Sequence, residues 1–302
     1  MESLPAVTQS PVLSGTAVLA WRRQQLQRGG RPVDLDWLLD LGAGISWSSL
    51  QQLRIDPERT VEIRCSLEAL EQQWQLHLDQ AVPLQHLVGR CPWRDLELEV
   101  SAAALIPRQE TELLLDLAEQ RLGRARIHRW ADLGTGSGAL AVAMARAWPD
   151  AAGHAVDLSA DALGLAERNL QRWGGLWHCQ LHRGSWWEPL RPWWGQLDLV
   201  LSNPPYIPAD QLAGLHPVVR DHEPHLALSG GMDGLDAIRE VIAGAVSALS
   251  PGGYLLLEHH HDQSSAVMDL MGQSGLLECE PAKDLQGVLR FAIARCPGSA
   301  TR

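Results

Sequence analysis

A glycine-rich turn between an apolar strand and an apolar helix constrains the fold of this chain more than any other segment. Residues 130–138 read Trp-Ala-Asp-Leu-Gly-Thr-Gly-Ser-Gly, and residues 139–145 continue as a helical pattern. Glycines let a backbone approach a ligand closely, and the helix offers free N–H groups at its N-terminus. A second predicted strand, residues 153–157, ends in Asp157, about 20 residues past the turn. A carboxylate there can accept hydrogen bonds from two ribose hydroxyls, so the segment predicts a nucleoside site.

A polar turn follows a further apolar run, residues 197–201, which is typical of a buried strand. The turn reads Ser-Asn-Pro-Pro-Tyr-Ile over residues 202–207. Asn203 offers a side-chain carbonyl, and the two prolines stiffen the backbone while their own carbonyls stay free to accept. Tyr206 adds a flat ring that can sandwich a planar group. Fixed acceptors can hold the –NH2 of an amide or a base, so the turn indicates methylation of a planar nitrogen; a proline-rich turn without a ligand is the alternative.

The composition is that of an acidic globular protein. The 302 residues carry a formal net charge of −11, and 45% of them are hydrophobic. That balance argues against a dedicated binder of duplex DNA, because such proteins need a basic face. Five scattered cysteines without a Cys-x-x-Cys pair indicate reduced thiols. The sequence has no apolar stretch of ~18 residues, so we expect a cytoplasmic protein without a membrane partner.

Hydrophobic periodicity divides the chain into three parts. Residues 1–82 follow a helical pattern and predict a small all-α helical bundle. Residues 83–104 include a stretch of alternating polarity and predict a β-hairpin linker. Residues 105–302 alternate strands with helices, which is typical of an α/β fold with a mostly parallel sheet. Strands are expected near 128–133, 153–157, 197–202 and 253–258.

Together these motifs resemble the bacterial release-factor N5-glutamine methyltransferases. The resemblance is carried by residues 105–112 (Leu-Ile-Pro-Arg-Gln-Glu-Thr-Glu), 132–138, Asp157, 202–207, 222–224 and 251–259. It implies a Rossmann-like class I methyltransferase sheet of seven strands, preceded by a helical domain that engages the substrate protein. The implied cofactor is S-adenosylmethionine, with S-adenosylhomocysteine as its product. The implied substrate is the side-chain N5 of the glutamine in the Gly-Gly-Gln motif of class I peptide chain release factors.

The resemblance also implies roles for individual residues. The cofactor would be bound by Gly134, Thr135, Gly136, Ser137, Gly138, Asp157, Trp186 and Asn203. The glutamine amide would be held by Asn203, Pro204, Pro205 and Tyr206, of which Asn203, Pro204 and Tyr206 are the expected catalytic residues. An amide nitrogen is a poor nucleophile, so we expect the carbonyls of Asn203 and Pro204 to accept its two hydrogens and orient it. The chain departs from the family pattern at Gln109, Ser185 and His260.

Several residues keep a second interpretation. Trp186 is either a wall of the adenine site or part of the core. Arg108, Glu110 and Glu112 either line the cleft or mark the N-terminus of a helix, where acids favour the dipole. Glu223 is either a support of the site or a solvated loop residue.

A run of three histidines, residues 259–261, invites a metal site. Adjacent residues on a strand point to opposite faces, so the three side chains are not expected to converge on one ion. We therefore expect no metal.

Three other functions stay open. An enzyme that methylates glutamine in a ribosomal protein is one, and the Ile106-Pro107-Arg108 segment argues against it. An adenine amino-methyltransferase shares the Asn-Pro-Pro-Tyr turn, but the acidic balance argues against a nucleic-acid partner. A catalytically silent cofactor-binding protein is disfavoured by the intact Asn203 and glycine turn. In each case a monomer is the simplest expectation.

Overall fold

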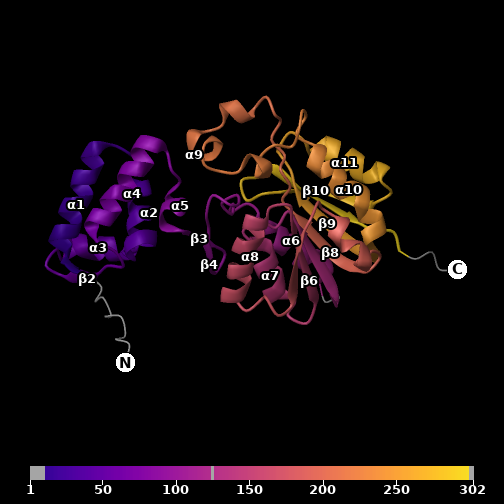
Figure 1. Cartoon of the computed structure of the whole chain (residues 1–302), viewed down its shortest axis with the longest axis horizontal. Coiled ribbons are helices and arrows are strands. Elements are labelled where there is room, and N and C mark those ends of the chain that lie inside the picture. The colour runs from indigo at the N-terminus through magenta and orange to yellow at the C-terminus, as the bar shows by residue number, and fades with distance from the viewer. Residues whose placement is uncertain (1–10, 124–125, 299–302) are drawn as a thin grey trace. The chain divides into compact units, whose positions relative to one another are not determined.

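The computed structural model describes residues 11–123 and 126–298, and the chain divides into two compact units, residues 1–90 and 91–302 (Figure 1). Each unit has a hydrophobic core of its own. The expected helical bundle, residues 1–82, falls in the first unit, apart from its first ten residues, which lie outside the described ranges.

Helices make up most of the first unit. Their bounds are α1 (Gly15–Arg28), α2 (Pro32–Leu38), the π-helical turn η1 (Leu39–Ala43), α3 (Trp47–Ile55), α4 (Leu67–Gln80) and α5 (Leu84–Val88). Ser14, Ser46 and Ser66 precede α1, α3 and α4, and each hydroxyl accepts a hydrogen bond from a backbone N–H in the first turn. Such a cap is worth about 1 kcal/mol to the helix. Buried side chains such as Leu70 and Trp74 of α4 pack into one core.

The first unit also contains two short strands that the expected all-α bundle did not include. β1 (Val12–Ser14) and β2 (Thr60–Glu62) pair antiparallel, with Leu13 opposite Val61. Strands of three residues are too short to display the alternating pattern by which strands are recognised in a sequence.

A seven-stranded sheet forms the centre of the second unit. Its strands are β5 (Arg129–Leu133), β6 (Ala152–Asp157), β7 (Cys179–Arg183), β8 (Leu197–Ser202), β9 (Leu249–Glu258), β10 (Leu277–Lys283) and β11 (Leu289–Arg295). They lie in the order β10-β11-β9-β8-β5-β6-β7. Neighbouring strands in the part β9-β8-β5-β6-β7 are parallel. Strand β11 runs antiparallel to both of its neighbours, β10 and β9. The expected Rossmann-like sheet is thereby confirmed.

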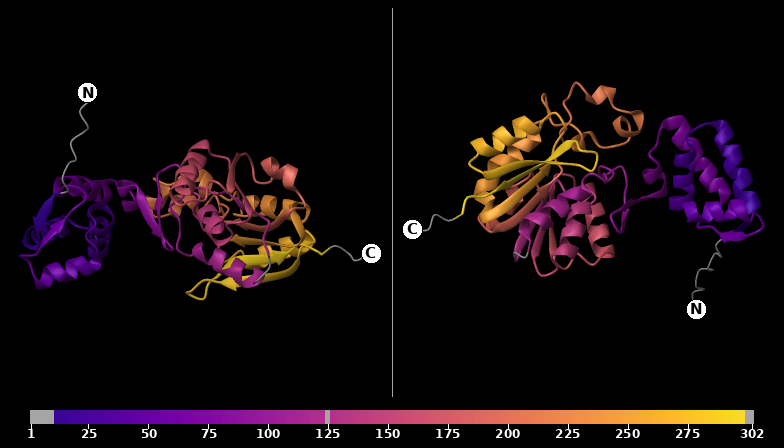
Figure 2. Two further views of the ribbon diagram at one scale, coloured as in Figure 1. Left: turned by 90° about the horizontal axis from the view of Figure 1, so that it is seen from below. Right: turned by 180° about the vertical axis from the view of Figure 1, so that it is seen from behind.

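Helices cover both faces of this sheet (Figure 2). One face carries α6 (Glu112–Leu122), α7 (Ala139–Ala147) and α8 (Ala160–Arg172), and the other carries α10 (Asp236–Ala248) and α11 (Ser264–Gln273). The hairpin strands are β3 (Arg90–Trp93), which starts at the last residue of the first unit, and β4 (Leu96–Glu99). Short elements complete the second unit: the helix α9 (Pro217–Arg220) and the 3-10 turns η2 (Glu188–Trp193), η3 (Leu212–Gly214) and η4 (His225–Ala227).

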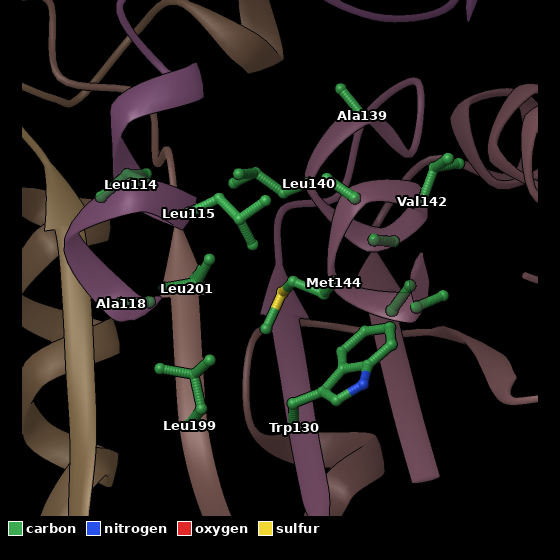
Figure 3. Packing of buried hydrophobic residues seen from close by; sticks show 14 of the residues in the cluster. Leu114, Leu115, Ala118, Trp130, Ala139, Leu140, Val142, Met144, Leu199 and Leu201 are labelled. Atoms are coloured by element: carbon green, nitrogen blue, oxygen red, sulfur yellow. The ribbon is translucent and has the colours of Figure 1, made fainter. Parts of the chain in front are cut away.

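The strands divide their side chains between two cores. Along β9, Leu256 packs toward α6 and α7, whereas Leu255 and Leu257 pack toward α10 and α11. Figure 3 shows the first of these cores, in which Trp130 of β5 lies beneath Met144 of α7. A strand buried on both faces is apolar throughout, which explains the continuous apolar runs in the sequence.

Four strands lie where the sequence analysis expects them, and β7, β10 and β11 were not located individually. All of β10 except two half-buried side chains is exposed, so its sequence lacks an apolar run. Within the described ranges, no helix is both long enough and apolar enough to cross a membrane.

Candidate active site

A cavity of about 330 Å³ opens at the carboxyl ends of β5, β6 and β8. Ligands of open α/β sheets bind at this edge, where the strand order reverses. The expected site residues that line the cavity are Gly134, Thr135, Gly136, Ser137, Asp157, Trp186, Asn203 and Pro205. Three other expected site residues, Gly138, Pro204 and Tyr206, are not among the described residues that line it.

The glycine turn needs its glycines for backbone conformation and for space. Gly134, Gly136 and Gly138 have φ values of 74°, 53° and 82°, in the left-handed region that side chains disfavour. A Cβ on Gly138 would lie 3.0 Å from the backbone of Ala166 in α8. The turn can therefore stay close to α8 while α7 begins directly behind it.

Asp157 ends β6 and holds the glycine turn in place. One carboxylate oxygen accepts from the backbone N–H of Gly136 at 2.8 Å, and the other accepts from that of Ser159 at 2.9 Å. Burial raises the pKa of this carboxyl, and the backbone hydrogen bonds from Ser159 and Gly136 oppose that rise. Each oxygen keeps a lone pair for a further donor from the cavity.

Asp132, at the end of β5, is a site residue to which the sequence analysis assigned no role. Its Oδ2 accepts from the Thr135 hydroxyl at 2.6 Å and from the Ala141 backbone N–H at 3.1 Å. Its Oδ1 is buried and has no hydrogen-bond partner among the described residues. Burial raises the pKa of this carboxyl to about 7, partly offset by the Thr135 hydrogen bond. Asp132 lines the cavity, so this unpaired oxygen is a candidate acceptor for a donor or a cation bound there.

Asn203 belongs to a chain of hydrogen bonds that joins three elements. Its Nδ2 donates to the Thr111 hydroxyl at 3.0 Å, and that hydroxyl donates to Oε2 of Glu258 at 2.7 Å. Tyr206 donates its phenolic hydrogen to Oε1 of the same carboxylate at 3.0 Å. Thr111 precedes α6 and Glu258 ends β9, so the turn after β8 is tied to both.

Glu258 is the second site residue without an assigned role, although the sequence carries a signal for it. A single acid ends the apolar run Tyr254–Leu257, and acids at strand ends of such sheets face the ligand edge. Glu258 is 1% exposed, and this burial raises the pKa of its carboxyl. The hydrogen bonds from Thr111 and Tyr206 lower the pKa and so partly offset the rise. Burial likewise raises the pKa of the Tyr206 hydroxyl, which stays protonated.

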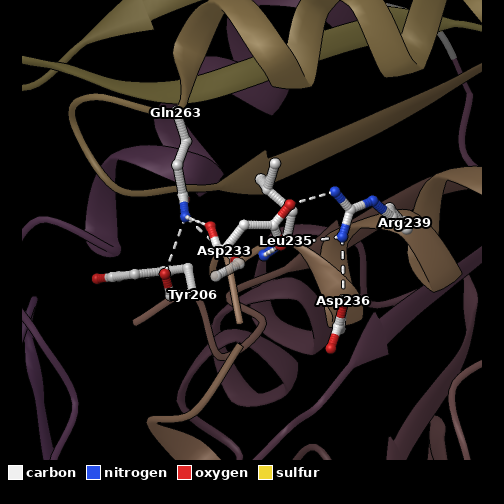
Figure 4. A network of polar contacts seen from close by, with 7 residues as sticks. Tyr206, Asp233, Leu235, Asp236, Arg239 and Gln263 are labelled. Carbon is white, nitrogen blue, oxygen red and sulfur yellow. Dashed lines mark hydrogen bonds and ion pairs between the residues drawn. The ribbon is translucent and has the colours of Figure 1, made fainter. Parts of the chain in front are cut away.

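The backbone of Tyr206 has its own support, shown in Figure 4. Nε2 of Gln263 donates to the carbonyl of Tyr206 at 2.9 Å and to that of Gly234 at 3.1 Å. Arg239 pairs with Asp233 on the same loop. Tyr206, in the segment after β8, is thus fixed through its side-chain hydroxyl by Glu258 and through its backbone carbonyl by Gln263.

The half-buried Arg108 pairs with the buried Glu223 beside the cavity. Nη2 of Arg108 donates to Oε1 of Glu223 at 2.7 Å, and the Ile106 backbone N–H donates to Oε2 at 3.3 Å. Arg108 lines the cavity, and Glu223 is 4% exposed. Glu112 instead begins α6 and accepts from the Arg94 backbone N–H at 2.8 Å.

The two neighbouring tryptophans have different environments. Trp187 is buried, and its indole N–H donates to the carbonyl of Val241 at 3.0 Å, so it belongs to the core. Trp186 lines the cavity, and its ring lies so close to Gly134 that a Cβ there would be 3.3 Å from it. Trp186 has a φ of 44°, an uncommon value for a bulky residue.

The three histidines do not lie on one strand, because β9 ends at Glu258. His259 is buried, whereas His260 and His261 lie with Asp262 so that one ligand atom of each falls within 4.8 Å of the others. Nδ1 of His260 already pairs with Asp262 at 2.6 Å. Strand alternation therefore does not separate these side chains, contrary to the reason given from the sequence.

Comparison with known proteins places this arrangement in a family. A sequence model described as "Methyltransferase small domain" matches residues 109–233. The "Release factor glutamine methyltransferase" of Prochlorococcus marinus is 56% identical over 94% of this chain and 98% of its own length. The protein of the same name from Gloeobacter violaceus is 41% identical over 90% of this chain and 95% of its own.

Solved structures share the fold at much lower identity. The hMettl16 catalytic domain, in complex with MAT2A 3'UTR hairpin 6, has a TM-score of 0.55 at 13% identity, covering 79% of this chain and 84% of that one. Identity this low shows the methyltransferase fold alone. The sequence relatives, which match over nearly their whole length, show more: this chain belongs to the release factor glutamine methyltransferase family.

Proposed function

We propose that this chain methylates the side-chain N5 of the glutamine in the Gly-Gly-Gln motif of class I release factors, with S-adenosylmethionine as methyl donor. The single observation that carries the proposal is that Asp157 and Asn203 line one cavity. The first suits a ribose and the second suits a planar amide. The names of the relatives supply the substrate class.

The residues around the cavity fit S-adenosylmethionine. The orphaned Oδ1 of Asp132 is a partner for a cationic group, Asp157 keeps lone pairs for ribose hydroxyls, and the ring of Trp186 offers a face for a base. The cavity volume of about 330 Å³ lies in the range of small-molecule sites. Bound there, the cofactor supplies an electrophilic methyl group on a sulfonium.

In this proposal the protein acts by orienting the amide nitrogen. Oδ1 of Asn203 and the backbone carbonyl of Pro204 accept the two amide hydrogens, which aims the nitrogen lone pair. Nδ2 of Asn203 is already bound to Thr111, so the carbonyl end of the side chain is the one available to substrate. Pro205 and Tyr206 bound the glutamine pocket. No side chain needs to be a strong base, because the proton leaves only after the nitrogen has gained the methyl group and goes to water.

The two units divide the work. Residues 1–82 engage the release factor, residues 83–104 link the helical bundle to the methyltransferase domain, and residues 105–302 carry the chemistry. All the described residues that line the cavity lie within residues 91–302, and we propose that the chain acts as a monomer in the cytoplasm.

The test is transfer of a radiolabelled methyl group from S-adenosylmethionine to purified release factor. A release factor whose Gly-Gly-Gln glutamine is changed to Ala serves as the matched control. Label on the normal protein and none on the control is the expected result. Label on both refutes the assigned position, and label on neither, with the cofactor still bound by calorimetry, refutes the substrate.

A further inference from the structure

We infer that Thr111 and Glu258 are positioning residues that fix which end of the Asn203 amide faces the substrate, and that this polarity makes the site select an amide over a carboxylate. The inference deepens the proposed function and rests on it. Neither residue is among those expected to touch the cofactor or the glutamine.

The polarity starts at Glu258. An ionised carboxylate accepts hydrogen bonds and donates none. Its two oxygens accept from the hydroxyls of Thr111, at 2.7 Å, and Tyr206, at 3.0 Å. A hydroxyl has one hydrogen, so Thr111 has none left to donate elsewhere.

The direction of the Thr111 hydrogen bond in turn fixes the orientation of the Asn203 side chain. Because the Thr111 oxygen can only accept from Asn203, it must be met by the –NH2 end of that side chain, and Nδ2 lies 3.0 Å from it. Had the Asn203 amide been turned over, its carbonyl oxygen would face a hydroxyl oxygen with no hydrogen between them. The network therefore determines the orientation of an amide whose two ends are nearly identical in shape.

A second feature sets Thr111 apart from an ordinary helix cap. It occupies the N-cap position of α6, where a threonine hydroxyl usually accepts from the backbone of the first turn. Here the side chain makes no such bond within the described structure and reaches across to β9 instead. The Thr111 backbone has helical angles, φ −61° and ψ −21°, whereas a capping residue is usually extended, so its hydroxyl is free to serve Glu258 and Asn203.

The consequence for substrate choice follows from donors and acceptors. Oδ1 of Asn203 needs a donor opposite it, which a glutamine amide has and a glutamate carboxylate lacks. If the Asn203 side chain could rotate freely, its –NH2 group could instead donate a hydrogen bond to a carboxylate, and a glutamate substrate would bind. Sites built around a fixed hydrogen bond reject a ligand that lacks the partner group, because a buried polar atom is then left unpaired.

The test compares Thr111→Val with Thr111→Ser. Valine keeps the shape but removes the oxygen that holds Nδ2, whereas serine restores the oxygen. We would measure kcat and KM for methylation of release factor, and cofactor affinity by calorimetry. We would also measure the affinity of each enzyme, loaded with S-adenosylhomocysteine, for release factors carrying Gln or Glu in the Gly-Gly-Gln motif.

For Thr111→Val we expect kcat to fall about ten-fold or more, cofactor affinity to stay within about two-fold, and the preference for Gln over Glu to shrink about ten-fold. Thr111→Ser should recover both kcat and the preference. An unchanged Gln-over-Glu preference in Thr111→Val would overturn the inference, as would a loss confined to cofactor affinity. If the wild-type enzyme methylates no release factor, the proposed function falls and takes this inference with it; active wild type with an unaltered valine variant removes the inference alone.

Discussion

Asp132→Asn should make the protein more stable at neutral pH while weakening cofactor binding. Asparagine is the neutral isostere, and its carbonyl oxygen can keep the hydrogen bonds from Thr135 and Ala141 that Oδ2 accepts. The wild-type carboxyl is 1% exposed, and burial raises its pKa from 3.8 to about 7. The folded state therefore holds this proton to a higher pH than the unfolded state does. Its contribution to stability is complete below about pH 4 and is lost as the pH rises through about 7.

The size of the effect follows from that shift. A change from 3.8 to about 7 is about 3 pKa units, and each unit corresponds to 1.36 kcal/mol, so ionisation costs the folded state up to ~4 kcal/mol. The asparagine variant does not ionise. The difference in unfolding free energy between variant and wild type should be near zero at pH 4 and should approach ~4 kcal/mol in favour of the variant at pH 8.

The assay is urea unfolding at pH 4, 5, 6, 7 and 8 without added cofactor. Asp95→Asn is the matched control, because Asp95 lies on the surface with 67% of its side chain exposed. Its variant should differ little from wild type at any pH. A pH-independent difference for Asp132→Asn would refute the assignment of the buried charge. Calorimetry at pH 8 should show S-adenosylmethionine bound about ten-fold or more weakly, because the variant offers –NH2 or a neutral oxygen to a cation.

Three further predictions follow from the same structure. Asn203→Ala should reduce kcat by about 100-fold or more and cofactor affinity far less; equal losses in kinetics and calorimetry would contradict the proposed division of roles. Gly153→Ala should destabilise the protein by about 1–3 kcal/mol in urea unfolding, because its Cβ would lie 2.2 Å from the Trp130 ring, whereas Gly164→Ala in the open face of α8 should stabilise it by about 0.5–1 kcal/mol. Wild-type kcat should fall on the acid side as Glu258 takes up a proton, at a pH above its ordinary range because burial raises its pKa; Thr111, Tyr206 and Arg290 oppose that rise and Glu110 adds to it. In Glu258→Gln a pH–rate profile should lack this limb, and an identical limb would assign it elsewhere.

Much of the fold can be predicted from the sequence because it depends on the local pattern of apolar residues and turn residues. Apolar runs such as 197–201 are buried on both faces of the sheet, and glycine is required where the turn after β5 takes left-handed angles. The order of the glycine turn, Asp157 and the Asn203 turn was equally visible, since parallel strands bring their carboxyl ends to one edge whatever the details of packing. Strands that carry no apolar run, such as β10, were not located.

The sequence by itself determined the fold class, the position of the cavity and the family, because these depend on periodicity, turn residues and motif order. Tertiary structure alone decided what Thr111 and Glu258 do. They lie 147 positions apart, and only the packing of α6 against the end of β9 brings their oxygens to 2.7 Å. The orphaned oxygen of Asp132 likewise exists only once the surrounding chain has excluded water from it. The burial of Asp132 and the direction of the hydrogen bonds between Thr111 and Glu258 depend on the residues around them in the folded protein. No local sequence pattern can therefore predict them.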